Sequence, residues 1–489
     1  MTMSDSHRLL IRGGAILSMD RLVGDFPTGD LLIEEGKIVA IAPRLDVDDA
    51  EVVDAAGMIV MPGFVDTHRH VWQTQLRGVA MDWSLFDYTV QMRTMYSVCY
   101  DPEDAYVGNY MGAIEALNAG VTTFIDHSHL QLSEDHTDGL AQGLLDAGIR
   151  GVFGYGVYRN PVYRPGDQDI DVDALKAELF GPLSSFHRAN AERARDKYFP
   201  SNDGLLRFGI ATSEFSAFSD MAPVLEEMAW CRTLQPARIS AHIGVGVENE
   251  LHIIEGLAKA GLLGEDLLLV HGAHLTDEEI RLVSEHGASI STTPETELQM
   301  GMGYPVAERF EAAGGHPSLG VDICSNVSGD MFAQMRLMLQ TQRFRDYERA
   351  GHLPTRLDYP TRKILEMGTL GGARALGLES LVGSLTPGKQ ADIIMIRTDT
   401  VPMVAVNDPV AAVVFYAQSS DIHNVLVAGR FVKRDGRLVG VDWPSLRART
   451  ERSRDNIFRR LAQIPIEQVQ AAWAGFYRLE NDAEAAMLP

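Results

Sequence analysis

Hydrophobic residues along most of this chain follow two alternating patterns, short continuous runs and longer stretches with helical spacing. The longer stretches include 102–119, 221–233, 249–260 and 276–286. Eight short runs between them have the length of buried strands and lie at 64–66, 122–125, 152–155, 206–211, 238–241, 267–270, 289–292 and 318–321. Eight strands that alternate with helices predict an α/β fold of the TIM-like (β/α)8 barrel type.

The two ends of the chain differ from the middle, because short strand patterns there are separated by Gly, Asp and Pro. They lie at 9–11, 15–19, 31–34 and 38–41 near the start, and at 392–396, 413–416, 424–427, 430–433 and 438–439 near the end. We expect both ends to pair into one small β-sandwich domain. The predicted division is 1–60 and 376–442 for this β-domain, 61–375 for the barrel, and 443–489 for a helical extension carrying Trp473 and Phe476.

Composition narrows the range of partners. The 489 residues include 45% hydrophobic side chains and carry a net charge of -24, which suits a large globular protein and opposes binding to nucleic acid. No stretch of about 18 uncharged apolar residues predicts a membrane span. Three widely spaced cysteines, Cys99, Cys231 and Cys324, favour a reducing, cytoplasmic location. A small-molecule substrate is the expected partner.

Candidate metal ligands follow several of the predicted strands. His68 and His70 flank Arg69 directly after the first barrel strand, so in extended backbone their rings point to the same side. His242, His271 and Asp322 each follow a later strand immediately. Because a barrel gathers the carboxyl ends of its strands around one mouth, these side chains are expected to meet there.

This donor set points to hydrolytic metal chemistry. Three neutral imidazoles and one carboxylate suit Zn2+ with an open position for water, although Fe2+, Mn2+ or Co2+ accept the same donors. Such an ion lowers the pKa of bound water and polarises the carbon under attack. Asp322 would take the water's proton and pass it to a leaving nitrogen, and His271 would hydrogen-bond the water or the attacked oxygen.

At these residues the chain resembles the amidohydrolase superfamily, in particular the branch with cytosine deaminase and the triazine hydrolases. The resemblance implies metal ligands at His68, His70, His242 and Asp322, a catalytic histidine at His271, and a homo-oligomer. It also implies one metal ion, because binuclear relatives use a strand-four lysine and 206–213 contains none. It covers nearly the whole chain and rests on Met-Pro-Gly-Phe-Val-Asp-Thr-His-Arg-His at 61–70 and on the motifs at 119–126, 271–277, 320–326 and 383–392.

The chain departs from this branch at one catalytic position. Mononuclear deaminases of the branch carry HxxE, whose glutamate protonates a ring nitrogen, whereas this chain has Val245 three residues after His242. Valine cannot move a proton, which weakens the deaminase hypothesis. Glu248, Glu295 or Glu297 could replace the glutamate. Alternatively none is needed, because metal and histidine alone can activate an amide, urea or carbamate carbonyl.

Three hypotheses therefore remain open. We favour a metal-dependent hydrolase that cleaves an amide, urea or carbamate C–N bond of a small molecule, which can be aromatic. The alternative is an aminohydrolase or dechlorinase of a nucleobase, pterin or triazine ring. An inactive barrel that only binds partners is disfavoured, because a residue able to bind metal occurs at every expected ligand position. The predicted substrate contacts lie near strand ends: Trp72, Gln73, His127, Tyr155 and Glu295.

Overall fold

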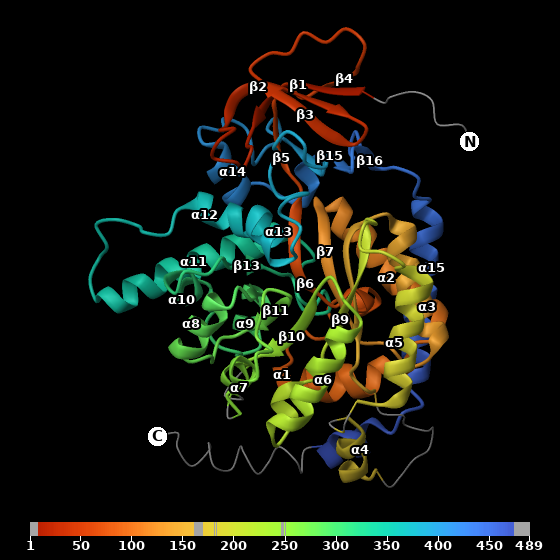
Figure 1. Cartoon of the computed structure of the whole chain (residues 1–489). Coiled ribbons are helices and arrows are strands. Elements are labelled where there is room, and N and C mark those ends of the chain that lie inside the picture. The colour runs from red at the N-terminus through yellow and green to blue at the C-terminus, as the bar shows by residue number, and fades with distance from the viewer. Residues whose placement is uncertain are drawn as a thin grey trace.

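Two sheets organise the molecule, a parallel barrel from the middle of the chain and a mixed sheet from its two ends (Figure 1). The computed structural model describes residues 8–160, 170–179, 181, 183–245, 249 and 251–473. The red N-terminal strands and the blue C-terminal strands lie together at the top of Figure 1, above the barrel. The predicted fold class is confirmed.

The barrel strands are parallel and occur in chain order around the sheet. Each lies at or within a few residues of its predicted run, because buried parallel strands consist of continuous apolar residues. They are β6 (Phe64–Arg69), β7 (Val121–Ser128), β8 (Arg150–Gly156), β9 (Leu206–Ala211), β10 (Ile239–Ile243), β11 (Leu267–His271), β12 (Ser289–Thr292) and β13 (Ser318–Leu319).

Helices cover the outside of the barrel, and their ends follow capping signals in the sequence. Asp101 caps α2 (Pro102–Asn118) and Thr276 caps α8 (Asp277–Glu285), each in a reciprocal capping box. The predicted helix at 249–260 is shorter than expected. The other helices around the barrel are α3 (Glu134–Ala147), α5 (Ser185–Tyr198), α6 (Met221–Thr233), α7 (Ile253–Lys259), α9 (Pro294–Gln299), α10 (Ala307–Ala312) and α11 (Met331–Ala350).

The mixed sheet joins the two chain ends through the antiparallel pairing of β5 (Met58–Pro62) with β14 (Ile393–Arg397). One strand prediction is wrong, because 413–416 belongs largely to the helix α14 (Pro409–Phe415), which Asp408 caps and Pro409 begins. The remaining strands are β1 (Arg8–Ile16), β2 (Phe26–Glu34), β3 (Lys37–Ala42), β4 (Glu51–Asp54), β15 (Ile422–Val427), β16 (Arg430–Arg434) and β17 (Arg437–Leu438).

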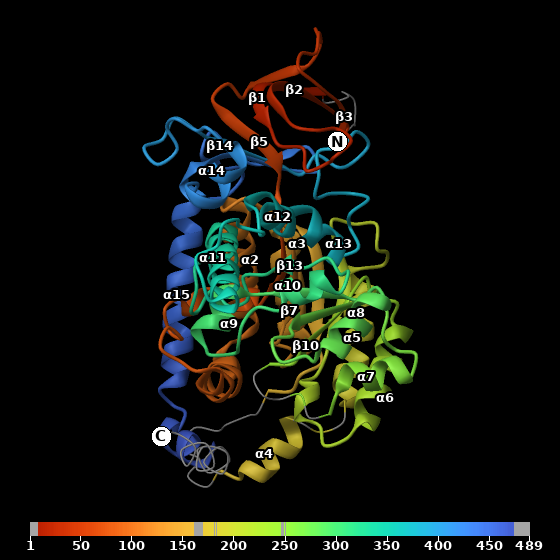
Figure 2. The ribbon, with the colours of Figure 1, turned by 90° about the vertical axis from the view of Figure 1, so that its left-hand side faces the viewer.

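The helix α15 (Trp443–Leu461) runs along the barrel beside α2 (Figure 2). Its Ser453 hydroxyl is buried, donates to Asp104 Oδ1 of α2 (2.7 Å) and accepts from Gln75 Nε2 (3.0 Å). Trp473 is buried as well, whereas Phe476 lies outside the described residues. Among the helices that the structure describes, none has the length and apolar character needed to cross a bilayer.

Candidate metal centre

The last barrel strand closes onto the first through the predicted metal ligands. Asp322 N donates to His68 O and His70 N donates to Asp322 O, both at 2.8 Å. A Cβ atom at Gly320 would lie only 2.8 Å from the His68 Cβ and 2.9 Å from its backbone nitrogen, so glycine permits this approach. The strands therefore bring these residues together as predicted.

Three pairs of donor atoms among the four predicted ligands lie at similar distances. His68 Nε2 lies 3.3 Å from both Asp322 Oδ1 and His242 Nε2, and His70 Nε2 lies 3.4 Å from Asp322 Oδ1. Ligands at about 2.0–2.1 Å from a tetrahedral Zn2+ are separated by roughly 3.3–3.4 Å. His68, His70 and Asp322 form one group whose donor atoms lie within 4.8 Å of one another, and His242 belongs to a second such group with His68 and His271. Imidazole nitrogens and a carboxylate at these spacings are donors that suit a divalent cation.

Hydrogen bonds orient two of the ligand rings. His70 Nδ1 donates to the carbonyl of His127 (2.8 Å), and His242 Nδ1 donates to Glu214 Oε2 (3.1 Å). Both contacts place the proton on Nδ1 and leave Nε2 with a free lone pair, as in the carboxylate–histidine–metal arrangement of many metalloenzymes.

Burial and charge set the protonation states that metal binding needs. Burial lowers the pKa of His68 to about 4 and that of His70 well below its usual value. Burial alone would raise the pKa of Asp322, but the hydrogen bond and charge of His68 outweigh it and lower this pKa. At neutral pH His68 and His70 are thus neutral and Asp322 is ionised, as metal binding needs.

His271 lies beside the predicted ligands, and its Nδ1 is hydrogen-bonded to the carboxylate of Glu297. Its Nδ1 donates to Glu297 Oε1 (3.3 Å) and lies 3.2 Å from Thr293 Oγ1. Thr293 N also donates to Glu297 Oε1 (2.8 Å), at the start of α9. Nε2 is therefore the ring nitrogen of His271 that remains free to face His68 and His242. The donor atoms of these three histidines lie within 4.8 Å of one another. Glu297, one of the three glutamates considered from the sequence, is fully buried here.

The predicted substrate contacts are only partly gathered at this centre. His127 stacks on His242 with ring centroids 4.3 Å apart, and its Nδ1 is 3.2 Å from Ser240 Oγ. Trp72 is buried against Tyr100 (5.1 Å) and its ring lies 6.5 Å from that of His129.

The other three predicted contacts are held by neighbouring elements. The Gln73 amide donates to Tyr88 Oη (2.6 Å) and accepts from Ser325 Oγ (2.7 Å). Tyr155 Oη accepts from Asn190 Nδ2 of α5 (3.1 Å), which turns this side chain toward the outer helices. Glu295 Oε2 accepts from Gln334 Nε2 of α11 (2.7 Å). The polar atoms of these three side chains are therefore hydrogen-bonded to neighbouring elements and not to the histidines.

Val245 is half-buried at the position of the expected glutamate, and Glu248 lies outside the described residues. Burial raises the pKa of Glu295 to about 7, but its contact to α11 directs it away from His271. Glu297 is therefore the glutamate, among the described candidates, that touches a predicted catalytic side chain.

Two residues near the centre were missed by the sequence analysis. Glu214 follows β9 by three residues, so the strand-end rule would have found it. Arg93, in the π-helical segment η2 (Tyr88–Tyr96), donates from Nη1 to Glu214 Oε1 (2.9 Å), and no motif marks it. His129, whose ring stacks on His70 at 4.1 Å, has no hydrogen-bond partner for either ring nitrogen among the described residues.

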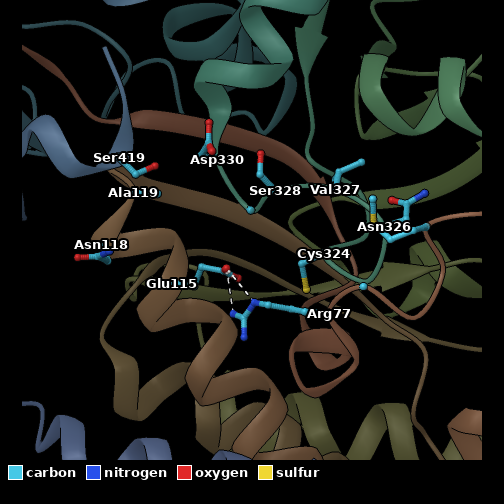
Figure 3. A pocket seen from close by; sticks show the side chains of 13 residues that line it. Arg77, Glu115, Asn118, Ala119, Cys324, Asn326, Val327, Ser328, Asp330 and Ser419 are labelled. Atoms are coloured by element: carbon cyan, nitrogen blue, oxygen red, sulfur yellow. Dashed lines mark hydrogen bonds and ion pairs between the residues drawn. The ribbon is translucent and has the colours of Figure 1, made fainter. Parts of the chain in front are cut away.

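A separate cavity of about 310 Å³ lies between α2 and the loop that follows β13 (Figure 3). Arg77 and Glu115 form an ion pair across it, with Arg77 Nη2 2.9 Å from Glu115 Oε1. Its lining includes Cys324 and Asn326 but none of the ligand-type histidines. The predicted metal-ligand histidines therefore lie apart from this cavity.

Known proteins resemble this chain over most of its length. The amidohydrolase family model matches residues 59–432. A 5-methylthioadenosine/S-adenosylhomocysteine deaminase of Halobacterium salinarum is 30% identical over 451 residues, which cover 91% of this chain and 96% of the relative. A 5'-deoxyadenosine deaminase of Methanothermobacter thermautotrophicus is 28% identical over 448 residues, covering 89% and 95%.

Solved structures share the fold at lower sequence identity. An adenosine deaminase from Xanthomonas campestris with bound zinc has a TM-score of 0.76 and 24% identity, covering 92% of this chain and 98% of its own. Atrazine chlorohydrolase from Arthrobacter aurescens, complexed with zinc, has a TM-score of 0.77 and 21% identity, covering 91% and 100%. The names of these proteins support the ring-hydrolase alternative better than the amide, urea or carbamate hypothesis that we favoured from the sequence.

Proposed function

The chain belongs to the amidohydrolase family, and on this basis we propose that it is a zinc-dependent aminohydrolase that removes an amino group from a nitrogen heterocycle. The similar deaminases act, by their names, on adenosine derivatives. An adenine-like aminopurine is therefore the first substrate class to test. The observation that carries the proposal is the buried His271–Glu297 pair beside the four metal ligands.

Ring deamination needs two proton carriers, one for the attacking water and one for the ring nitrogen. Asp322 serves the first role, because its carboxylate is ionised and lies among the ligand histidines. His271 serves the second role in place of the glutamate that Val245 has replaced. Glu297 holds its Nδ1 proton and stabilises the charged ring, so that Nε2 can donate to the substrate and be protonated again.

The proposed cofactor is a single Zn2+ ion held by His68, His70, His242 and Asp322. When bound, it would supply a water of lowered pKa and polarise the ring carbon. His127 and His129 form another close group, but it also needs His242. Because His242 Nδ1 is bound to Glu214, its one remaining nitrogen cannot serve two ions, which favours one ion. We keep His127, which stacks on this ligand, as the proposed substrate contact among those predicted.

A second candidate function is favoured by one observation. Val245 leaves the strand-five loop without the glutamate that protonates a ring nitrogen. Hydrolysis of an amide, urea or carbamate does not require that protonation, because the attacked carbonyl oxygen is bound directly by metal and histidine.

The experiment that separates the two functions is a parallel assay of the zinc-loaded protein. Ammonia release is measured from adenosine, 5'-deoxyadenosine and aminotriazines, and amine release from N-aryl amides and ureas. We expect ammonia from at least one heterocycle and a lower rate for Glu297→Gln, with Glu295→Gln as the matched control that leaves the rate unchanged. Amine release alone would support the second candidate. If the protein released neither ammonia nor an amine, that result would contradict the proposal that it is a hydrolase.

A further inference from the structure

The buried side chain of Arg93 has one edge without a hydrogen-bond partner among the described residues. Arg93 is only 4% exposed, and its Nη1 donates to Glu214 Oε1 (2.9 Å). Its Nε and Nη2 are buried and have no hydrogen-bond partner among the described residues. Unpaired guanidinium N–H groups are unfavourable when shielded from water, which indicates that a partner arrives from outside the chain.

This guanidinium lies at the mouth where the metal ligands meet. Glu214 links it to the ligand His242, because the same carboxylate accepts from both side chains. The Tyr158 ring covers one face of the guanidinium, with Arg93 Cζ 3.6 Å from the ring centroid. The Tyr158 ring in turn lies 5.9 Å from His129. Glu214 and Tyr158 thus hold the guanidinium at Nη1 and on one face, and its Nε–Nη2 edge has no hydrogen-bond partner among the described residues.

The Nε–Nη2 edge donates two parallel hydrogen bonds, and a carboxylate accepts both in one plane. If Arg93 served only as the counter-charge of Glu214, Nη1 alone would be enough. We propose that Arg93 is a substrate-binding residue and that the substrate carries a carboxylate, bound by this edge, on the side remote from the hydrolysed bond. The inference rests on the proposed function in so far as that function places the substrate at this mouth.

Binding of simple probes tests the inference without turnover. We would titrate the zinc-loaded full-length protein with benzoate, and with benzamide as its neutral isostere, by calorimetry. The wild type should bind benzoate at least about 10-fold more tightly than benzamide, because charge-assisted bidentate hydrogen bonds are the strong ones. Arg93→Met should lose this preference, and zinc content should be unchanged.

Two further variants separate a binding role from a structural one. Arg93→Lys keeps a positive charge beside Glu214 but lacks the planar edge, so it should retain zinc and bind benzoate about 10-fold more weakly. Arg188 is the matched control, because it also lies over an aromatic ring, that of Trp230 (5.3 Å), and pairs with a glutamate, Glu226 (2.8 Å). Arg188→Met should leave benzoate binding unchanged.

Each remaining outcome decides the question. Equal binding of benzoate and benzamide by the wild type would overturn the inference. Undiminished benzoate binding by Arg93→Lys with zinc retained would also overturn it, since the metal and not the arginine would then hold the carboxylate. A protein that passes this test but releases neither ammonia nor amine would contradict the proposed function alone.

Discussion

The two ends of the barrel differ in how the buried polar groups named below are hydrogen-bonded. At the end that faces the mixed sheet, Arg150 donates to both oxygens of Asp392 (2.8 and 3.0 Å), and Asp392 Oδ1 also accepts from Ala428 N (2.8 Å). At the mouth, His68 Nδ1, both ring nitrogens of His129, two nitrogens of Arg93 and Glu297 Oε2 are buried without a hydrogen-bond partner in the described chain.

Left-handed backbone at non-glycine residues occurs at both ends, because Ala428, which donates to Asp392, has a φ of 48°. His271 has a φ of 75° and Asp322 a φ of 73°, in the left-handed region that non-glycine residues rarely adopt. Each such residue costs on the order of 1–3 kcal/mol. The two ends therefore differ in the pairing of these buried polar groups and not in backbone strain, because Arg150 and Asp392 are hydrogen-bonded to each other whereas the groups named at the mouth have no partner among the described residues.

The largest effect that would test this contrast is expected for Asp322→Asn. The variant loses both a metal ligand and the proposed base, so kcat/KM should fall on the order of 10⁴-fold or more. In the metal-free protein its thermal midpoint should fall, because the lowered pKa of Asp322 means that the folded state stabilises the ionised carboxylate at neutral pH. Steady-state kinetics and thermal unfolding with a chelator measure the two effects. Unchanged kinetics with zinc retained would contradict the assignment of Asp322 to the centre.

His271→Ala should separate chemistry from metal binding. Because His271 is proposed to move a proton and not to hold the ion, turnover should fall on the order of 10²–10⁴-fold. Zinc content, measured by plasma spectrometry, should remain that of the wild type. Loss of zinc in this variant would instead make His271 a ligand.

Asp392→Asn should lower stability and leave catalysis unchanged. It leaves Arg150 buried without its counter-charge, and breaking a buried pair in this way costs about 3–5 kcal/mol. We expect denaturant unfolding to report that loss while kcat per zinc-bound, folded molecule is unchanged. A fall in kcat without a fall in stability would show that the two ends are not separate in role.

The smallest predicted effect concerns Glu227, which holds the loop that carries Glu214. Its Oε1 accepts from Ser213 N (2.8 Å), and burial raises the pKa of Glu227 to about 7. Because the folded carboxyl keeps its proton to higher pH than the unfolded one, stability should decrease as pH rises from about 4.3 through 7. Glu227→Gln should flatten this part of the pH–stability curve, and an unchanged slope would contradict the assignment.

The sequence predicted that the ligand side chains meet, because residues that end neighbouring strands of a barrel lie around one mouth. His68, His242 and Asp322 could therefore be placed together without coordinates. Arg93 could not, because the long segment after the first strand follows no periodic rule and its π-helical geometry has no sequence signal. The strand predicted at 413–416 failed because Asp408 and Pro409 start a helix, a local signal that outweighs the run of β-branched residues.

The choice of reaction could not be read from the ligands alone. Val245 favoured an amide-like substrate, whereas the similarity to deaminases and the buried Glu297 behind His271 favour a ring amino group. In our proposal the proton donor is His271 of β11 with Glu297 of α9 behind it, and contacts between distant segments of that kind are set by tertiary packing.

We propose that His68, His70, His242 and Asp322 form one zinc site at which an amino group is hydrolysed. The most direct test of this site measures zinc stoichiometry and ammonia release from adenosine derivatives together, in the wild type and in His242→Ala. We predict one zinc per chain with ammonia release in the wild type, and the loss of both in the variant. Full ammonia release from a His242→Ala protein without zinc would contradict the account.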